Sequence, residues 1–103
     1  MTVIKSADVH KLVVACDAGM GSSVMLASQL RKQLKKYPVT VVHSPVAEIP
    51  ADADVVVCHA GLAERARATA GAGTVVVPFQ VFLGDPAVTR IVKLIQDGGE
   101  IDV

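Results

Sequence analysis

A cysteine followed by a run of small residues is the feature of this chain that points most directly to chemistry: Cys16-Asp17-Ala18-Gly19-Met20-Gly21-Ser22-Ser23. The apolar stretch 11–15 before it predicts a strand that carries the thiol to its carboxyl end, and the amphipathic pattern after it predicts a helix. A loop between a strand and a helix can direct consecutive backbone N–H groups, and the positive end of the helix dipole, at one point. The segment therefore indicates a phosphate cradle built around a nucleophile.

The residues of the loop suit such a cradle individually. Gly19 and Gly21 allow positive φ angles or a close approach of the backbone to a ligand, which a Cβ would obstruct. One of Ser22 and Ser23 is expected to be the N-cap of the helix and the other to donate its hydroxyl to a phosphoryl oxygen, and the sequence leaves open which does which. The same amides should favour the thiolate of Cys16.

A packing role is the competing interpretation of this segment. Strand-Gly-x-Gly-helix turns occur in many α/β proteins, and a free cysteine is often only a small buried hydrophobe. Cys16, however, is expected at the carboxyl end of its strand, which is where open α/β sheets bind their ligands. With two glycines and two serines following it, we favour the functional interpretation.

The loop lacks a cation where a phosphate-hydrolysing cysteine site would need one. The spacing from Cys16 to Ser22 is the one at which cysteine phosphatases place an arginine. Without a guanidinium to clamp the oxygens of the phosphoryl group in flight, hydrolysis of a phosphate ester loses much of its electrostatic stabilisation. The segment thus favours a phosphoryl carrier, supplied by a high-energy donor such as a protein phosphohistidine.

Two stretches of the chain resemble a known family. Val14-Ala15-Cys16-Asp17-Ala18-Gly19-Met20-Gly21-Ser22-Ser23 closely resembles the active-site segment of the enzyme IIB components of the bacterial phosphoenolpyruvate-dependent sugar phosphotransferase system, with the mannitol-type branch nearest. Cys58-His59-Ala60-Gly61-Leu62-Ala63-Glu64-Arg65-Ala66 is similar to that branch's His-x-x-Leu-x-Glu-Arg-Ala segment after the third strand. The resemblance runs in register from about Lys11 to Gln96.

The resemblance implies a phosphoryl relay. A phosphohistidine on a IIA component would pass its phosphoryl group to Cys16, and the phosphocysteine would pass it to a sugar held by the membrane-embedded IIC component, with no cofactor and no metal. It also implies a cytoplasmic location at the inner face of the membrane, reached through IIC. Mannitol-type relatives usually carry threonine where this chain has Cys58, so mannitol or another polyol is the expected sugar without being fixed. The phosphoryl ligands would be the backbone amides of Asp17, Ala18, Gly19, Met20, Gly21, Ser22 and Ser23, with the Ser23 hydroxyl as the preferred additional donor.

Three further residues have roles that the sequence leaves open. The imidazole of His59, which follows the third strand, is a candidate to support the Cys16 thiolate or to meet the donor, and a purely structural histidine is the alternative. Asp17 would either raise the energy of the phosphocysteine by repulsion or be a solvent-facing turn residue. Cys16 and Cys58 end strands that are expected to be adjacent, which makes a reversible disulfide between them a candidate. Such a bond requires that both side chains point to the same face of the sheet.

Alternating strand and helix signals predict an α/β fold with helices on both faces of an open sheet. The sheet is expected to have four parallel strands in the order 2-1-3-4, as in the phosphatase-like IIB fold that the resemblance implies, with Cys16 near the switch point. The strands are predicted at Leu12–Ala15, Val39–His43, Val55–Cys58 and Thr74–Val77, and the helices at about Ser22–Lys36, Leu62–Thr69 and Pro86–Gln96.

Length and composition bound the remaining choices. The 103 residues predict a single IIB-like phosphocarrier domain over 1–103, with 1–10 and 98–103 as flexible ends. No apolar run approaches the roughly 20 residues needed to cross a bilayer, and no signal peptide is visible, so direct membrane insertion is not expected. The formal net charge is zero, which argues against nucleic acid as a partner, as does the small aromatic set of Tyr37, Phe79 and Phe82.

Two other classes of function stay open beside the carrier. One is a cysteine-dependent phosphatase or oxyanion reductase on the same scaffold, which the missing arginine disfavours. The other is a IIB-like regulatory module that senses phosphorylation without passing the group on. The sequence does not decide whether the chain is a free-standing subunit or a domain of a longer protein, nor its oligomeric state.

Overall fold

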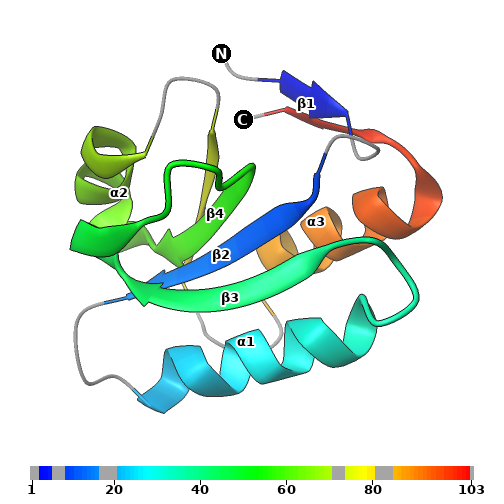
Figure 1. Ribbon diagram of the computed structural model, residues 1–103, viewed down its shortest axis with the longest axis horizontal. Helices are drawn as coiled ribbons and strands as arrows, with labels where there is room; N and C mark the ends of the chain where they lie inside the picture. The colour runs from blue at the N-terminus through cyan, green and yellow to red at the C-terminus, as the bar shows by residue number, and fades with distance from the viewer. Residues whose placement is uncertain (1–2, 6–8, 17–20, 71–73, 81–84, 103) are drawn as a thin grey trace.

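The fold is built on a parallel sheet of four strands. The computed structural model describes the backbone of residues 3–5, 9–16, 21–70, 74–80 and 85–102. The strand order is β3-β2-β4-β5, which confirms the predicted order 2-1-3-4 (Figure 1). The strands are β2 (Lys11–Cys16), β3 (Thr40–Pro45), β4 (Val55–His59) and β5 (Val75–Phe79).

The strands are aligned by hydrogen bonds at their amino ends. One carboxylate oxygen of Asp54 accepts from the backbone N–H groups of His10 and Lys11, at 2.8 and 3.0 Å. The backbone of Asp54 extends the same alignment, because its N–H donates to the Lys11 carbonyl and its own carbonyl accepts from Val75, both at 3.0 Å. The buried hydroxyl of Thr74 donates to the Ala53 carbonyl at 2.8 Å. The starts of β2, β4 and β5 are therefore fixed relative to one another.

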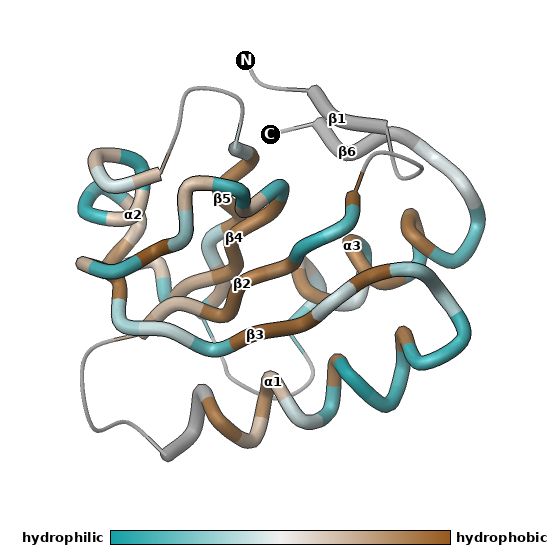
Figure 2. The backbone as a smooth tube through the Cα atoms, viewed as in Figure 1, coloured by the Kyte–Doolittle hydropathy of each residue, from teal (hydrophilic) through white to brown (hydrophobic). Residues whose placement is uncertain are grey.

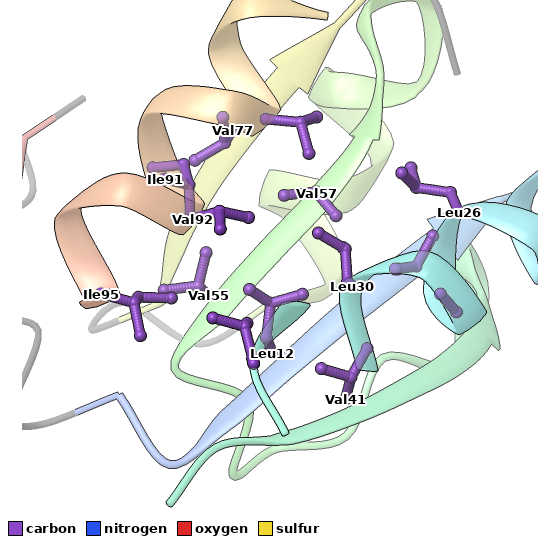
Figure 3. Packing of buried hydrophobic residues seen from close by; sticks show 14 of the residues in the cluster. Leu12, Leu26, Leu30, Val41, Val55, Val57, Val77, Ile91, Val92 and Ile95 are labelled. Atoms are coloured by element: carbon purple, nitrogen blue, oxygen red, sulfur yellow. The ribbon is translucent and has the colours of Figure 1, made fainter. Parts of the chain in front are cut away.

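Helices cover both faces of this sheet. On one face lie α1 (Gly21–Gln33) and α3 (Pro86–Asp97), and on the other lie α2 (Ala63–Thr69) and the short 3-10 turns η2 (Val46–Glu48) and η3 (Ala60–Leu62). Because side chains alternate along a strand, each strand contributes side chains to the hydrophobic layers on both faces of the sheet. Figure 3 shows the larger layer, in which Leu12, Val55, Val57 and Val77 of the strands meet Leu26, Leu30, Ile91, Val92 and Ile95 of the helices.

The helix α1 is amphipathic and shorter than predicted. Its sheet-facing residues Leu26, Ala27 and Leu30 are buried, whereas hydrophilic residues alternate with them along the helix (Figure 2). The sequence predicted an end near Lys36, but α1 ends at Gln33 and the chain continues in a turn. Pro38 explains the difference, because the residue before a proline is disfavoured in the helical conformation. The chain therefore leaves the α-helix and forms a turn over residues 34–38.

The two ends of the chain meet in a small second sheet. Residues Val3–Lys5 form β1 and pair antiparallel with β6 (Glu100–Asp102), with Ile4 opposite Ile101 (Figure 1). The sequence assigned neither segment to a strand and treated both as flexible ends. After α3 the chain is turned by Gly98, whose φ of 81° is a left-handed conformation that favours glycine. The N–H groups of Gly98 and Gly99 both donate to the Leu94 carbonyl, which closes the helix and leads into β6.

The amino end of α3 depends on a buried carboxylate. Asp85 precedes Pro86, and its side chain accepts from the N–H of Ala87 at 2.8 Å and from the N–H of Gln80 at 2.7 Å. The first bond caps the helix, and the second ties the end of β5 to its start. Asp85 is only 7% exposed, so water does not replace these bonds easily.

Replacing Asp85 with alanine should lower the free energy of unfolding by about 2 kcal/mol, because the N–H groups of Gln80 and Ala87 lose a buried carboxylate acceptor. Urea unfolding followed by circular dichroism measures this change. Thr89→Ala is the matched control, since Thr89 is exposed on the same helix, and it should leave the midpoint nearly unchanged. Equal midpoints for Asp85→Ala and the original chain would contradict the capping role.

Candidate functional site

Cys16 is the last residue of β2, at the carboxyl edge of the sheet. Its side chain is 2% exposed and its thiol is free. The next described element is α1, which begins at Gly21, so the sulfur lies at the end of a central strand with a helix start following it. This is the strand-to-helix arrangement that the sequence predicted.

The structure describes only part of the predicted cradle. Asp17, Ala18, Gly19 and Met20 lie outside the described residues, so their roles stay predictions. The backbone of Gly21, Ser22 and Ser23 forms the first turn of α1, which places both serines inside the helix rather than at the N-cap position expected for one of them. The first N–H groups of a helix have no acceptor within the helix, and a turn of this kind is where anions bind in other proteins.

A histidine that the sequence analysis did not single out contacts the thiol. The Sγ atom of Cys16 lies 3.0 Å from Nε2 of His43, which is half-buried on β3. In the β2–β3 register His43 pairs with Val14, and since alternate residues share a face, the side chains of His43, Val14 and Cys16 lie on the same side of the sheet. The predicted strand order together with this alternation was the signal that could have found the contact.

His59, the histidine expected near the sulfur, lies on the same face of the sheet as Cys16, because Ala15 pairs with Cys58 and side chains alternate along the strands. It is exposed at the end of β4, and its Nδ1 accepts from the N–H of Gly61 at 3.2 Å, which caps η3. Its ring meets the ring of Phe79 edge to face, with centroids 6.1 Å apart. These contacts agree with the structural alternative, and a supporting role for His59 at the sulfur stays a prediction.

Cys58 belongs to the opposite face of the sheet. It pairs in register with Ala15, so its side chain and that of Cys16 point to different faces. Cys58 is fully buried in the layer under α2, and both cysteines are free. Burial raises the pKa of the Cys58 thiol, and the charge of Arg67 offsets this in part. The geometry required for the disulfide considered from the sequence is therefore absent.

Oxidation should consequently leave Cys16 and Cys58 unlinked. Intact mass after treatment with diamide is expected to show no loss of two hydrogens, because the two Cβ atoms point apart and a bridge would need backbone movement. Cys58→Ala serves as the control for any oxidation at Cys16 alone. A loss of two hydrogens in the original chain that disappears in Cys58→Ala would mean that the register in solution differs from the one described.

The second motif, Cys58–Ala66, packs α2 against the sheet. Leu62, Ala63 and Ala66 are buried there with Cys58, while Glu64 and Arg65 are exposed. These apolar positions contribute to the layer on the face opposite Cys16. The motif thus contributes to the packing of the fold, and the structure shows no direct contribution of its apolar residues to the described surroundings of Cys16.

The surroundings of the site contain an apolar surface but no metal-binding cluster within the described part of the chain. Val24 and Met25, near the start of α1, are 51% and 61% exposed. No group of three or more histidine, cysteine, aspartate and glutamate side chains converges among residues that the structure describes.

A hollow of about 620 Å³ lies along α3, away from the thiol. It is lined by Arg90, Lys93 and four neighbouring residues and does not include Cys16 or His43.

Comparison with known proteins gives the family. The family model described as "PTS system, Lactose/Cellobiose specific IIB subunit" matches residues 11–94, and the chain belongs to this family. None of the helices that the structure describes is long and apolar enough to span a membrane.

Similar proteins carry mannitol in their names. The chain is 48% identical over 66 residues to the "PTS system mannitol-specific EIICBA component" of Vibrio cholerae, covering 62% of this chain and 10% of that protein. It is 47% identical over 62 residues to the "PTS system mannitol-specific EIICB component" of Bacillus subtilis, covering 58% and 13%. For the "PTS system mannitol-specific cryptic EIICB component" of Escherichia coli K12, identity is 39% over 80 residues, covering 76% and 17%. The aligned part is thus a small fraction of each relative.

Proposed function

We propose that this chain is a phosphoryl carrier, in which Cys16 accepts a phosphoryl group from a IIA phosphohistidine and passes it to a polyol held by a membrane IIC component. The observation that carries the proposal is the position of Cys16, a free thiol at the carboxyl end of a central strand, ahead of a helix start, in a chain of the IIB family. The amides of the first turn of α1 and those of residues 17–20 are the proposed phosphoryl ligands.

The partners follow from the relatives. The chain matches only 10% to 17% of the length of the EIICB and EIICBA components described above, so its partners would be supplied by other parts of such a protein or by separate chains. We assign the donor to a IIA domain and the acceptor site to a IIC domain, which would hold this chain at the inner face of the membrane. Cofactors are not needed for this transfer.

The sugar is proposed to be mannitol or a related polyol. The names of the similar proteins support mannitol, whereas the family description mentions lactose and cellobiose. We give the relatives more weight, because their identity over the aligned segment is 39% to 48%. The disagreement is expected if the sugar is selected in a domain outside this chain.

The described site fits transfer between partners better than hydrolysis. Cys16 is 2% exposed, so bulk water has little access to its sulfur. Ser22 occupies the position where a phosphatase would carry its arginine, and its backbone lies in the first turn of α1. Without that cation, attack by water on a phosphocysteine lacks its main electrostatic aid.

Incubation with a phosphoenolpyruvate-driven donor chain that includes a IIA domain should add one phosphoryl group to Cys16, because the donor phosphohistidine has enough transfer potential to form a thiophosphate. Intact mass and peptide mapping measure the adduct, which should survive acid that removes phosphohistidine. Cys16→Ser should lose the adduct completely, and Cys58→Ala should keep it.

Absence of an adduct with every donor tried, together with hydrolysis of a phosphate ester or reduction of an oxyanion by the original chain, would replace the carrier with the enzyme alternative. An adduct that membranes carrying IIC and mannitol fail to discharge would favour a sensing module.

A further inference from the structure

The contact between His43 and Cys16 gives the site a proton acceptor at the reacting atom. Nε2 of His43 and Sγ of Cys16 are 3.0 Å apart, within hydrogen-bonding distance, and the thiol is almost completely buried. Either a neutral imidazole accepts from the S–H group or an imidazolium donates to the thiolate, and both states place one proton between the same two atoms. A buried cysteine packed only among apolar side chains would lack this second state.

Among the residues that the structure describes, Cys16 on β2 and His59 at the end of β4 lie on the same face of the sheet as His43. Arg31 on α1, which covers that face, donates from Nε to the carbonyl of Val41 at 2.9 Å. Lys11 of β2 lies toward the opposite face, in an ion pair with Asp52 at 2.7 Å. Arg31 is a cation near the same stretch of β3, so its charge acts on a thiolate or phosphoryl group in the same direction as an imidazolium.

We propose that His43 takes the proton of the Cys16 thiol, which generates the thiolate that receives the phosphoryl group, and returns the proton when that group leaves. This role rests on the proposed function for the transfer itself, whereas the proton exchange between the two side chains does not. His43 acts directly on the reacting sulfur.

The proton and electron pairs balance in both half-reactions. In the first, the thiol proton moves to Nε2 of His43, the S–P bond forms, and the N–P bond of the donor breaks with its electron pair staying on the donor nitrogen. In the second, the sugar hydroxyl oxygen forms the new O–P bond, the S–P bond breaks with its pair on Sγ, and His43 returns its proton to that sulfur. The hydroxyl proton goes to a base on the sugar-holding partner or to water.

The pH dependence of Cys16 alkylation tests the proton exchange in the isolated chain. Iodoacetamide labelling from pH 5 to 9, with Cys16 and Cys58 distinguished by peptide mapping, is compared for the original chain and His43→Gln. Glutamine keeps a hydrogen-bond donor at similar reach but cannot take the proton. The rise of the Cys16 rate should move by about one pH unit to the alkaline side, which corresponds to about a tenfold slower reaction at pH 7.

The test depends on the pH at which the alkylation rate of Cys16 rises and not on the size of the rate. A change in access to the buried sulfur would scale the rate alike at every pH, so a structural effect alone does not move the midpoint. His10→Gln is the matched control, because His10 is exposed at the opposite end of the sheet, and its profile should overlay that of the original chain. A His43→Gln profile that also overlays it would overturn the proposal.

A second measurement does not depend on the His43→Gln variant. The imidazole of His43 is titrated by NMR in the original chain and in Cys16→Ser. Because coupling between two titrating groups is reciprocal, loss of the thiolate should move the His43 titration to lower pH. Identical titration curves in the two proteins would overturn the proposal. If the curves differ but the original chain accepts no phosphoryl group from any donor, the proton exchange is supported and the carrier function is rejected.

Discussion

The register of β2 between its two neighbours decides which side chains lie beside Cys16. Val14 pairs with His43 on one side, and Ala15 pairs with Cys58 on the other. Since side chains alternate between the two faces, a slip of one residue in the pairing would move every side chain of that strand to the other face of the sheet. The register is anchored at the amino edge of the sheet, where Asp54 holds the backbone of His10 and Lys11. The chemistry at one edge therefore depends on hydrogen bonds at the opposite edge.

This dependence explains how far the sequence could predict the molecule. The valine-rich runs and the amphipathic helices between them are local signals, and right-handed crossovers leave few ways to order four parallel strands. The strands β1 and β6 were missed because each has only three residues and its partner lies at the other end of the chain. A period of two cannot be recognised over so short a segment.

The site was predicted in part for the same reason. Cys16 and the loop after it are contiguous, so residue types and spacing were sufficient to predict a thiol at the end of a strand and ahead of a helix, which the structure confirms. His43 was assigned correctly to a strand, but its contact with the sulfur joins two residues that are 27 positions apart in sequence and meet only when their strands pair. No local sequence pattern contains that information. The Cys16–Cys58 disulfide was inferred from strand adjacency alone, without the register that places the two side chains on different faces. The same register leaves His59 on the face of Cys16, and its role there stays a prediction.

Under the proposed function, the buried sulfur and the exposed apolar residues near it serve different needs of a carrier. Restricted access at Cys16 protects a high-energy phosphoryl group from water, while a partner must still displace whatever covers it. Val24 and Met25 supply adaptable apolar contacts at the start of α1, and a flexible methionine can pack against more than one partner. One edge must then accept a protein donor and a membrane acceptor in turn, through complexes that dissociate quickly. A surface shared in this way would carry the phosphoryl chemistry, while the choice of sugar would fall to the partner that holds it, so Cys16 and His43 would bear on the reaction and not on its substrate.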